Sequence, residues 1–208
     1  EANKVHNAAA VILEVKTGKI LAYVGNANTS KKHANKVDVI RSVRSTGSVL
    51  KPFLYASALD KGYLLPSSLM ADVPTYYAGY SPKNYYLNFD GVVPADEALS
   101  RSLNVPFVRL LQEYRIELFY DQLKKIGMSS LRHPPSHYGL SLILGGAEIS
   151  LLDLTNMYAG MARTLNHFND NLPYSNSDYS FSKLLGEQNI QRKEEAPLLT
   201  AGAINHTF

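Results

Sequence analysis

The stretch Arg44-Ser-Thr-Gly-Ser48-Val-Leu-Lys51-Pro-Phe-Leu54 places a hydroxyl and an amine at the predicted start of a helix. Apolar residues recur with the spacing of a helix that buries one face, at Leu50, Phe53, Leu54 and Ala58. Pro52 fits only in the first turn, and Gly62 is placed to end the helix. Ser48 is therefore expected at or just before the N-terminus, where free backbone N–H groups favour developing negative charge. A serine there, with an amine one turn later, is a candidate nucleophile and base.

The S-x-x-K spacing by itself does not decide between chemistry and local structure. Ser180-Phe-Ser-Lys183 repeats the spacing in a polar stretch without helical context. Taken alone, Ser48 also fits a simple N-cap and Lys51 a solvated lysine in the first turn. The choice between these interpretations depends on the rest of the chain.

Composition limits the class of protein. A chain of 208 residues with 45% hydrophobic and 19% charged residues is typical of one soluble globular domain. The net charge of +3 comes without a long Lys/Arg run, so no nucleic-acid partner is expected. Cysteine is absent and the six histidines share no metal-ligand spacing, so we expect neither metal nor cofactor. The chain begins at Glu1 and ends within a helical pattern, so we expect a piece of a longer protein.

The remaining sequence predicts a mixture of strands and helices. Two apolar runs, 8–15 and 19–25, flank Lys16-Thr-Gly-Lys19 and predict a β-hairpin with Gly18 in its turn. Residues 64–94 are rich in proline and tyrosine and predict a long irregular loop with short strands, in which Tyr80-Ser-Pro-Lys-Asn84 is a candidate binding segment. Further predicted elements are helices over 95–101, 107–114 and 117–126, a helix from the capping box Ser150-Leu-Leu-Asp153 to about Leu165, a hairpin around 174–184 and a helix near Thr200.

Two of these motifs together resemble a known family. Ser48-Val-Leu-Lys51, followed by Ser102-Leu-Asn104 between two predicted helices, is similar to the first two signatures of the penicillin-recognising serine enzymes. The flanking sequence looks like class A penicillin-binding proteins of the 1C type, on the stretches 37–42, 44–55, 72–74, 100–106 and Ile143-Leu-Gly-Gly146. The resemblance extends from about Ala8 to Leu165.

The resemblance implies an α+β fold in which a central antiparallel sheet is flanked by helices. Residues 1–208 would form a single transpeptidase domain that is incomplete at its C-terminal end. A glycosyltransferase domain and a membrane anchor precede such domains, and we expect both to lie outside this chain. The implied location is the periplasmic side of a bacterial inner membrane. The implied partners are peptidoglycan stem peptides and β-lactam antibiotics.

The family's functional residues map onto four positions. Ser48 would attack the penultimate D-Ala carbonyl of a stem peptide, and Lys51 would take its proton. Because a free lysine has a pKa of about 10.4, bringing it to about 7 requires about 4 kcal/mol of desolvation and local charge, so Lys51 should be partly buried. Ser102 would relay a proton to the leaving nitrogen, and Asn104 would hold Lys51 and the substrate backbone. The alternative is that Ser102 and Asn104 only cap the helix opened by Pro106.

The third family signature, K-T-G after S-x-N, is missing. Lys16-Thr-Gly18 precedes the nucleophile and falls in a predicted turn, so we assign it no catalytic role. In the family, the strand that carries K-T-G supplies the second N–H group of the oxyanion hole. Because loss of one such donor typically costs about 10²–10³ in rate, we expect this chain to be an impaired enzyme. The chain has no E-x-x-L-N stretch after S-x-N, which argues against a class A β-lactamase. A D,D-carboxypeptidase and a non-catalytic scaffold domain remain alternatives to a D,D-transpeptidase.

Overall fold

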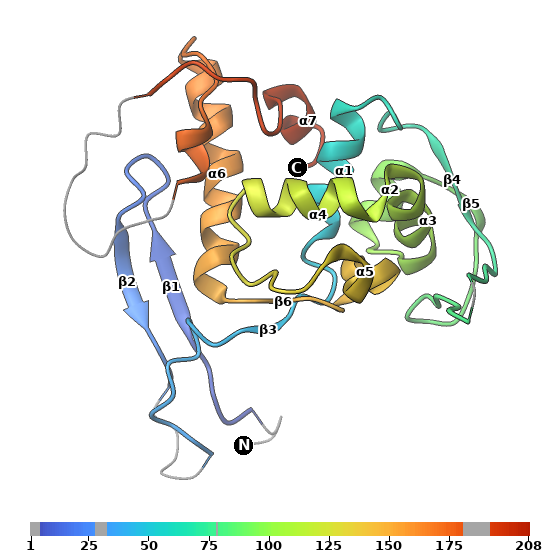
Figure 1. The fold of residues 1–208 in the computed structure, drawn as a ribbon, viewed down its shortest axis with the longest axis horizontal. Helices are drawn as coiled ribbons and strands as arrows, with labels where there is room; N and C mark the ends of the chain where they lie inside the picture. Colours follow the sequence, from blue (N-terminus) through green and yellow to red (C-terminus); the bar gives the residue numbers. More distant parts are fainter. Residues whose placement is uncertain (1–4, 28–32, 78, 181–191) are drawn as a thin grey trace. The chain divides into compact units, whose positions relative to one another are not determined.

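The computed structural model describes residues 5–27, 33–77, 79–180 and 192–208 (Figure 1). Its helices are α1 (Lys51–Asp60), α2 (Ala95–Ser100), α3 (Asn104–Tyr114), α4 (Ile116–Lys125), α5 (Pro135–Tyr138), α6 (Leu151–Asn169) and α7 (Ala201–Asn205), with 3-10 helices η1 (Gly139–Leu144) and η2 (Asn176–Tyr179). Its strands are β1 (Ala10–Leu13), β2 (Ile20–Val24), β3 (Arg44–Ser45), β4 (Leu69–Asp72), β5 (Gly91–Pro94) and β6 (Glu148–Ile149). The predicted α+β class is confirmed. None of the described helices is long and apolar enough to cross a membrane.

The chain divides into two compact units. One unit comprises Glu1–Arg44, Lys124–Ser130 and Glu148–Leu198. The other comprises Ser45–Leu123, Leu131–Ala147 and Leu199–Phe208. Each unit is assembled from segments that are distant in the sequence, and all four candidate site residues belong to the second unit.

The predicted N-terminal hairpin is present in the first unit. Strands β1 and β2 pair antiparallel, with Ala10 opposite Val24 and an irregularity after Ile12. Gly18 has a φ of 71° in the connecting turn, a value that glycine adopts without a Cβ clash. The upstream Lys-Thr-Gly sequence therefore forms a turn, as predicted.

Helix α6 begins where its capping signal predicts. The Ser150 hydroxyl accepts a hydrogen bond from the backbone N–H of Asp153 at 3.0 Å, which satisfies one of the free donors of the first turn. The Asp153 carboxylate does not complete a capping box, because it accepts a hydrogen bond from the Ser129 hydroxyl at 2.6 Å. The helix continues to Asn169, four residues beyond the predicted end.

The segment after α6 differs from the prediction. A hairpin was expected around 174–184, but residues Asn176–Tyr179 form the 3-10 helix η2. Ser175 favours this turn because its hydroxyl accepts from the backbone N–H of Ser177 at 3.3 Å. Residues 181–184, and with them most of the second S-x-x-K sequence Ser180-Phe-Ser-Lys183, lie outside the described residues.

Helix α1 is the most deeply buried element of the second unit. Pro52 lies in its first turn, and Gly62, with a φ of 71°, follows its end, both as predicted. The four residues of the predicted apolar face are completely buried. Tyr55, Ala56 and Ser57 are buried as well, so the prediction of a single buried face was too narrow. The helix packs against α2, α3 and α7, which surround more of it than one face.

The other predicted elements of the second unit are also present. Strands β4 and β5 pair antiparallel and enclose the proline- and tyrosine-rich loop, and α2 follows β5 directly (Figure 1). Helix α7 is capped by Thr200, whose hydroxyl accepts from the N–H of Ala203. Helix α3 begins at Asn104, two residues before Pro106, which was predicted to open it, so the proline occupies the third helical position. A proline there is tolerated because the first-turn N–H groups have no partner within the helix.

Candidate active site

Ser48 lies in a tight turn immediately before α1. Its backbone carbonyl accepts a hydrogen bond from the N–H of Lys51 at 3.1 Å, so the turn leads directly into the helix. The residue is half-buried, and its hydroxyl has no hydrogen-bond partner among the described residues. The placement at the helix N-terminus agrees with the sequence prediction, and the hydroxyl is free to meet a ligand.

The segment Gly145–Ala147 holds this turn in place. The Ala147 carbonyl accepts from the N–H of Thr46 at 2.9 Å, and the Gly145 carbonyl accepts from the Ser45 hydroxyl at 2.8 Å. A Cβ at Gly145 would lie 2.6 Å from the Ser45 Oγ and 2.9 Å from the Gly47 nitrogen. Only glycine permits this close approach. Sequence reasoning included this glycine only in a resemblance, and the structure gives it a role beside the candidate nucleophile.

Lys51 is the most completely enclosed charged group at the site. Its side chain is 1% exposed, which confirms the predicted burial. The Nζ atom donates to the Ser102 carbonyl at 2.7 Å, to the Ser102 hydroxyl at 3.2 Å and to Asn104 Oδ1 at 2.7 Å. An ammonium has three donors, and all three are used. Nζ also lies 5.6 Å from the centroid of the Phe107 ring, within cation–π range.

Burial lowers the pKa of Lys51 from 10.5 to about 8. The cause is desolvation, which disfavours the charged form of an amine. At pH 7 about one tenth of the amine is then neutral, against less than about one in a thousand for a free lysine. The direction and cause match the sequence prediction, and the value lies about one unit above the expected 7. Lys51 can therefore act as a base at neutral pH.

Ser102 has a strained backbone. Its φ is 54°, in the left-handed region that residues with a Cβ rarely adopt. It lies between α2 and α3, where its N–H donates to the Leu99 carbonyl at 2.9 Å. In this conformation both its carbonyl and its hydroxyl oxygen lie within hydrogen-bond distance of Lys51 Nζ. Such strain is often found at functional sites.

Asn104 is the first residue of α3, and hydrogen bonds hold both its backbone and its side chain. Its side-chain Nδ2 donates to the Lys83 carbonyl at 2.8 Å, which directs Oδ1 toward Lys51. Its backbone N–H donates to Asn84 Oδ1 at 2.9 Å. The sequence marked Tyr80–Asn84 as a candidate binding segment, and that role stays a prediction; the last two residues of the segment contact Asn104. Asn84 itself was not singled out, because nothing local shows that its partner lies 20 residues later.

The structure thus brings Lys51, Ser102 and Asn104 into one hydrogen-bonded group and places Ser48 one turn before Lys51. The Ser48 hydroxyl is not part of that group. A nucleophilic serine, a buried amine and an amide can together support acyl transfer. The catalytic roles themselves stay predictions.

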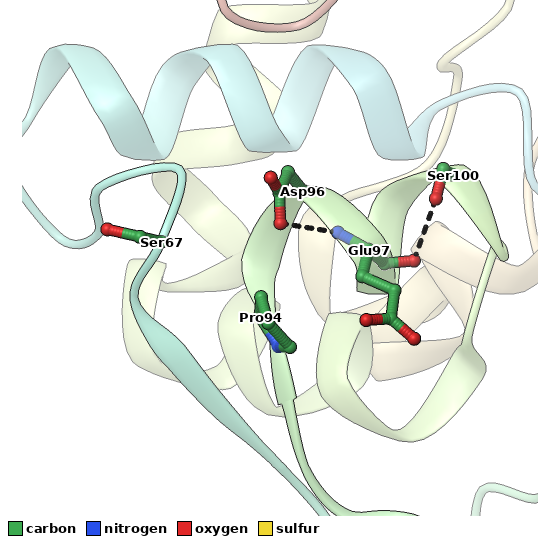
Figure 2. Close-up of a pocket in the computed structure, with 5 residues that line it drawn as sticks. All are labelled: Ser67, Pro94, Asp96, Glu97 and Ser100. Carbon is green, nitrogen blue, oxygen red and sulfur yellow. Dashed lines mark hydrogen bonds between the residues drawn. The ribbon is translucent and has the colours of Figure 1, made fainter.

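A separate pocket opens beside the start of α2 (Figure 2). It is lined by Ser67, Pro94, Asp96, Glu97 and Ser100, and by none of the four candidate residues. Its polar groups serve α2 itself, since the Asp96 carboxylate accepts from the Glu97 N–H and the Ser100 hydroxyl donates to the Glu97 carbonyl. Within the described residues no group of three His, Asp or Glu side chains could hold a metal ion.

Comparison with known sequences identifies related proteins. The family described as "Penicillin binding protein transpeptidase domain" matches residues 8–169. Penicillin-binding protein 1C of Escherichia coli K12 is 37% identical over 156 residues, which cover 74% of this chain and 20% of that protein. The chain spans about a fifth of the length of curated relatives that it matches.

Solved structures give the same picture. Penicillin-binding protein 1A from Haemophilus influenzae is 30% identical, with a TM-score of 0.64 over 74% of this chain and 23% of that chain. The apo structure of the TP domain from Burkholderia pseudomallei penicillin-binding protein 3 has a TM-score of 0.75 at 18% identity. That match covers 97% of this chain and 60% of the other, and it shows a shared fold.

Proposed function

Because the chain belongs to the family of penicillin-binding-protein transpeptidase domains, we propose that it carries the acyl-transfer site of a peptidoglycan cross-linking enzyme, with Ser48 as the nucleophile. The proposed substrate is the D-Ala-D-Ala end of a stem peptide, and β-lactam antibiotics would acylate the same serine. The proposed location of the whole protein is the periplasmic side of a bacterial inner membrane, with a glycosyltransferase domain and a membrane anchor outside this chain.

The observation that carries the proposal is the state of Lys51. A lysine that is 1% exposed, without a carboxylate among its hydrogen-bond partners, is costly to keep charged. A structural lysine gains nothing from this burial, whereas a general base needs it, because the neutral amine is the reactive form. Its position one turn after Ser48 supports a role in taking the proton of that hydroxyl.

The proposed reaction follows from these positions. Ser48 Oγ attacks the carbonyl carbon of the penultimate D-Ala as its proton passes to Lys51, so a C–O bond forms and a tetrahedral centre appears. The C–N bond to the last D-Ala then breaks, and the leaving nitrogen takes a proton relayed from Lys51 through the Ser102 hydroxyl. Asn104 holds the Lys51 amine and the substrate backbone. An amine of a neighbouring strand then attacks the ester carbonyl, so that a C–N bond forms, the C–O bond to Ser48 breaks, and the proton lost by the amine returns to Ser48 Oγ.

Two further parts of the proposal concern this particular chain. Without a K-T-G sequence after Asn104, we expect turnover of stem peptides to be impaired by about 10²–10³, the cost of one oxyanion-hole donor. Release of D-Ala from a stem peptide, with and without an added acceptor amine, separates a transpeptidase from a D,D-carboxypeptidase. Turnover near that of a full-length class A relative would contradict the expected impairment.

The decisive experiment is the mass of the intact protein after incubation with a penicillin. We expect one added drug mass on the parent and none on Ser48→Ala. Ser100→Ala is the matched control, because this exposed serine on α2 donates only to the Glu97 carbonyl. An adduct on Ser48→Ala would show that another group is the nucleophile. An absence of adduct on every variant would favour the non-catalytic scaffold and overturn the proposed activity of this chain.

A further inference from the structure

We propose that Asp72 and Asn84 are positioning residues of the acyl-transfer site, which act by fixing the start of α3 and through it Asn104. The inference rests on the proposed function only for its consequence in catalysis. Neither residue has a hydrogen bond to Ser48 or Lys51, so neither is proposed to touch the reacting atoms. Their effect would pass through Asn104.

Asn84 has a side chain whose hydrogen-bonding capacity is completely used. It is 4% exposed, and its Nδ2 donates to Asp72 Oδ1 at 2.7 Å and to the Asn88 carbonyl at 3.0 Å. Its Oδ1 accepts from the backbone N–H of Asn104 at 2.9 Å and of Val105 at 3.2 Å. A primary amide offers two donors and two acceptor positions, and all four are filled. A buried amide in this state is held in one orientation.

These contacts replace the cap that α3 lacks. The residue before the helix, Leu103, has no side chain that can accept a hydrogen bond. The first N–H groups of a helix need a partner from outside it. Asn84 supplies that partner from the loop between β4 and β5, so the place where α3 begins depends on a residue far away in the sequence.

Asp72 fixes which way the Asn84 amide points. Its side chain is 0% exposed, and its second oxygen, Oδ2, accepts from the Asp90 N–H at 3.0 Å. If the Asn84 amide were reversed, its oxygen would face the Asp72 carboxylate and its NH₂ group would face two N–H donors. Both contacts would be repulsive. The carboxylate therefore keeps the Asn84 oxygen directed at α3.

The fixed helix start determines how Lys51 is covered. Asn104 Oδ1 accepts a hydrogen bond from the Lys51 ammonium, and the backbone N–H of Asn104 donates to Asn84. Its side-chain amide is also bonded to the carbonyl of Lys83, the neighbour of Asn84. If the helix start loosened, the Asn104 side chain would leave Lys51 and water would reach the amine. Access of water would raise the pKa of Lys51 toward its value in solution.

The test is an exchange of the two side chains in this chain. Asp72→Asn and Asn84→Asp are made singly and together, and the titration of Lys51 is followed by the ¹³C shift of its Cε atom. In Asn84→Asp two carboxylates face each other, and in Asp72→Asn an NH₂ group faces either the Asn84 NH₂ group or the Asp90 N–H. In the double variant the amide introduced at position 72 can donate to the carboxylate introduced at position 84, which still accepts from α3 but no longer donates to the Asn88 carbonyl. Asp60→Asn is the control, because Asp60 accepts from Thr200 at the far end of α1.

We expect each single variant to raise the pKa of Lys51 by about one unit toward its solution value, and the double variant to reverse most of that rise, since only the contact with the Asn88 carbonyl is not recreated. Asp72→Asn is the most discriminating variant, because loss of a negative charge alone would lower the pKa of a lysine. Asp60→Asn should not raise it. The proposal is overturned if Asp72→Asn lowers the pKa of Lys51 or leaves it unchanged. It is also overturned if the pKa in the double variant stays as high as in the single variants. If one single variant does not fold, the double variant still decides, because it keeps the contacts with position 72 and with α3 and should fold and titrate close to the parent.

Acylation by a penicillin is measured on the same variants. If the parent is not acylated while Lys51 titrates as expected, the proposed function fails and the positioning of Lys51 by Asp72 and Asn84 stands. If the parent is acylated, the single variants should react about tenfold more slowly, and the exchange should recover the rate. A loss of melting temperature without either change would mark the pair as purely structural.

Discussion

The first N–H groups of α6 and of α3 are both capped, but the capping residue is adjacent in one case and remote in the other. At α6, Ser150 immediately precedes the helix, and its hydroxyl accepts from the third helical N–H at 3.0 Å. At α3, Leu103 cannot cap, and the oxygen of Asn84 accepts from the first two helical N–H groups. The local cap can be read from four consecutive residues. The remote cap joins a loop to a helix and cannot be read from either.

The helix with the remote cap, α3, is the one that carries a candidate site residue. Helix α6 begins with an apolar residue and contributes none of the four candidate site residues. Helix α3 begins with Asn104, which accepts a hydrogen bond from the Lys51 amine. A local cap stabilises only the helix that it belongs to, whereas a remote cap also fixes the helix start against another segment. The following predictions test that contrast.

Removal of the Lys51 amine should have the largest effect. If Asn104 holds a reactive base, Lys51→Ala should slow acylation by a penicillin by about 10³-fold, within the usual range for loss of a general base. The time course of adduct formation by intact mass measures this rate. Lys61→Ala is the control, because this exposed lysine lies at the other end of α1. If Lys51→Ala were acylated at the parent rate, Lys51 would not be the base, and the position of Asn104 at the start of α3 would have no effect on catalysis.

Removal of the remote cap should cost about 3 kcal/mol of unfolding free energy, because Asn84→Ala leaves one oxygen of the buried Asp72 carboxylate, Oδ1, and two helical N–H groups without their partner. Urea unfolding measures the change. Asn88→Ala is the matched control, since only the backbone carbonyl of Asn88 bonds to Asn84. A loss below about 1 kcal/mol would mean that water replaces the Asn84 side chain, and the two helix starts would then be equivalent.

The acylation rate should rise with pH through about 8, the pKa of Lys51. Burial lowers this pKa, so the reactive neutral amine grows from about one tenth of the population at pH 7 to about nine tenths at pH 9. The expected gain is about tenfold, measured from the initial rates of penicillin acylation across this range. The same profile is expected in Ser150→Ala. A rate independent of pH between 7 and 9 would indicate that Lys51 is not the base.

Removal of the local cap should have the smallest effect. Ser150→Ala should cost about 1 kcal/mol of unfolding free energy, the usual value for an N-cap, and Ser150→Asn should recover most of it. The acylation rate of a penicillin should stay at the parent value in both variants. Thermal unfolding and the adduct time course check the two parts. Slower acylation in Ser150→Ala would show that a local cap also reaches the site, which would break the contrast.

The sequence was informative wherever the signal and its effect are neighbours. Pro52 and Gly62 marked the start and end of α1, and Ser150 marked the start of α6, because each acts on the turn next to it. The apolar residues around Lys51 predicted a helix with one buried face, whereas the burial of Lys51 was predicted from the pKa that a base requires. The family was recognised from the two motifs at Ser48 and Ser102, and the match over residues 8–169 confirms it.

The sequence was not informative where the partner is remote. Pro106 was predicted to open helix α3, because neither Leu103 nor its neighbours indicate the cap that Asn84 provides. The 3-10 helix η2 lies where a hairpin was predicted, and its residue Asp178 pairs with His167 and Arg192, which lie 11 and 14 residues away in the sequence. The need for glycine at Gly145 became visible only with Ser45 and Gly47 beside it.

The three partners of Lys51 differ in what they can do when the amine loses a proton. A neutral amine has two donors and one lone pair. The Ser102 carbonyl and Asn104 Oδ1 can only accept, so a lone pair directed at either would meet another lone pair. The Ser102 hydroxyl can reverse its role and donate. Deprotonation of Lys51 is therefore directional: the neutral amine rests with its lone pair on the Ser102 hydroxyl, and it must turn that lone pair toward Ser48 before it can take the Ser48 proton.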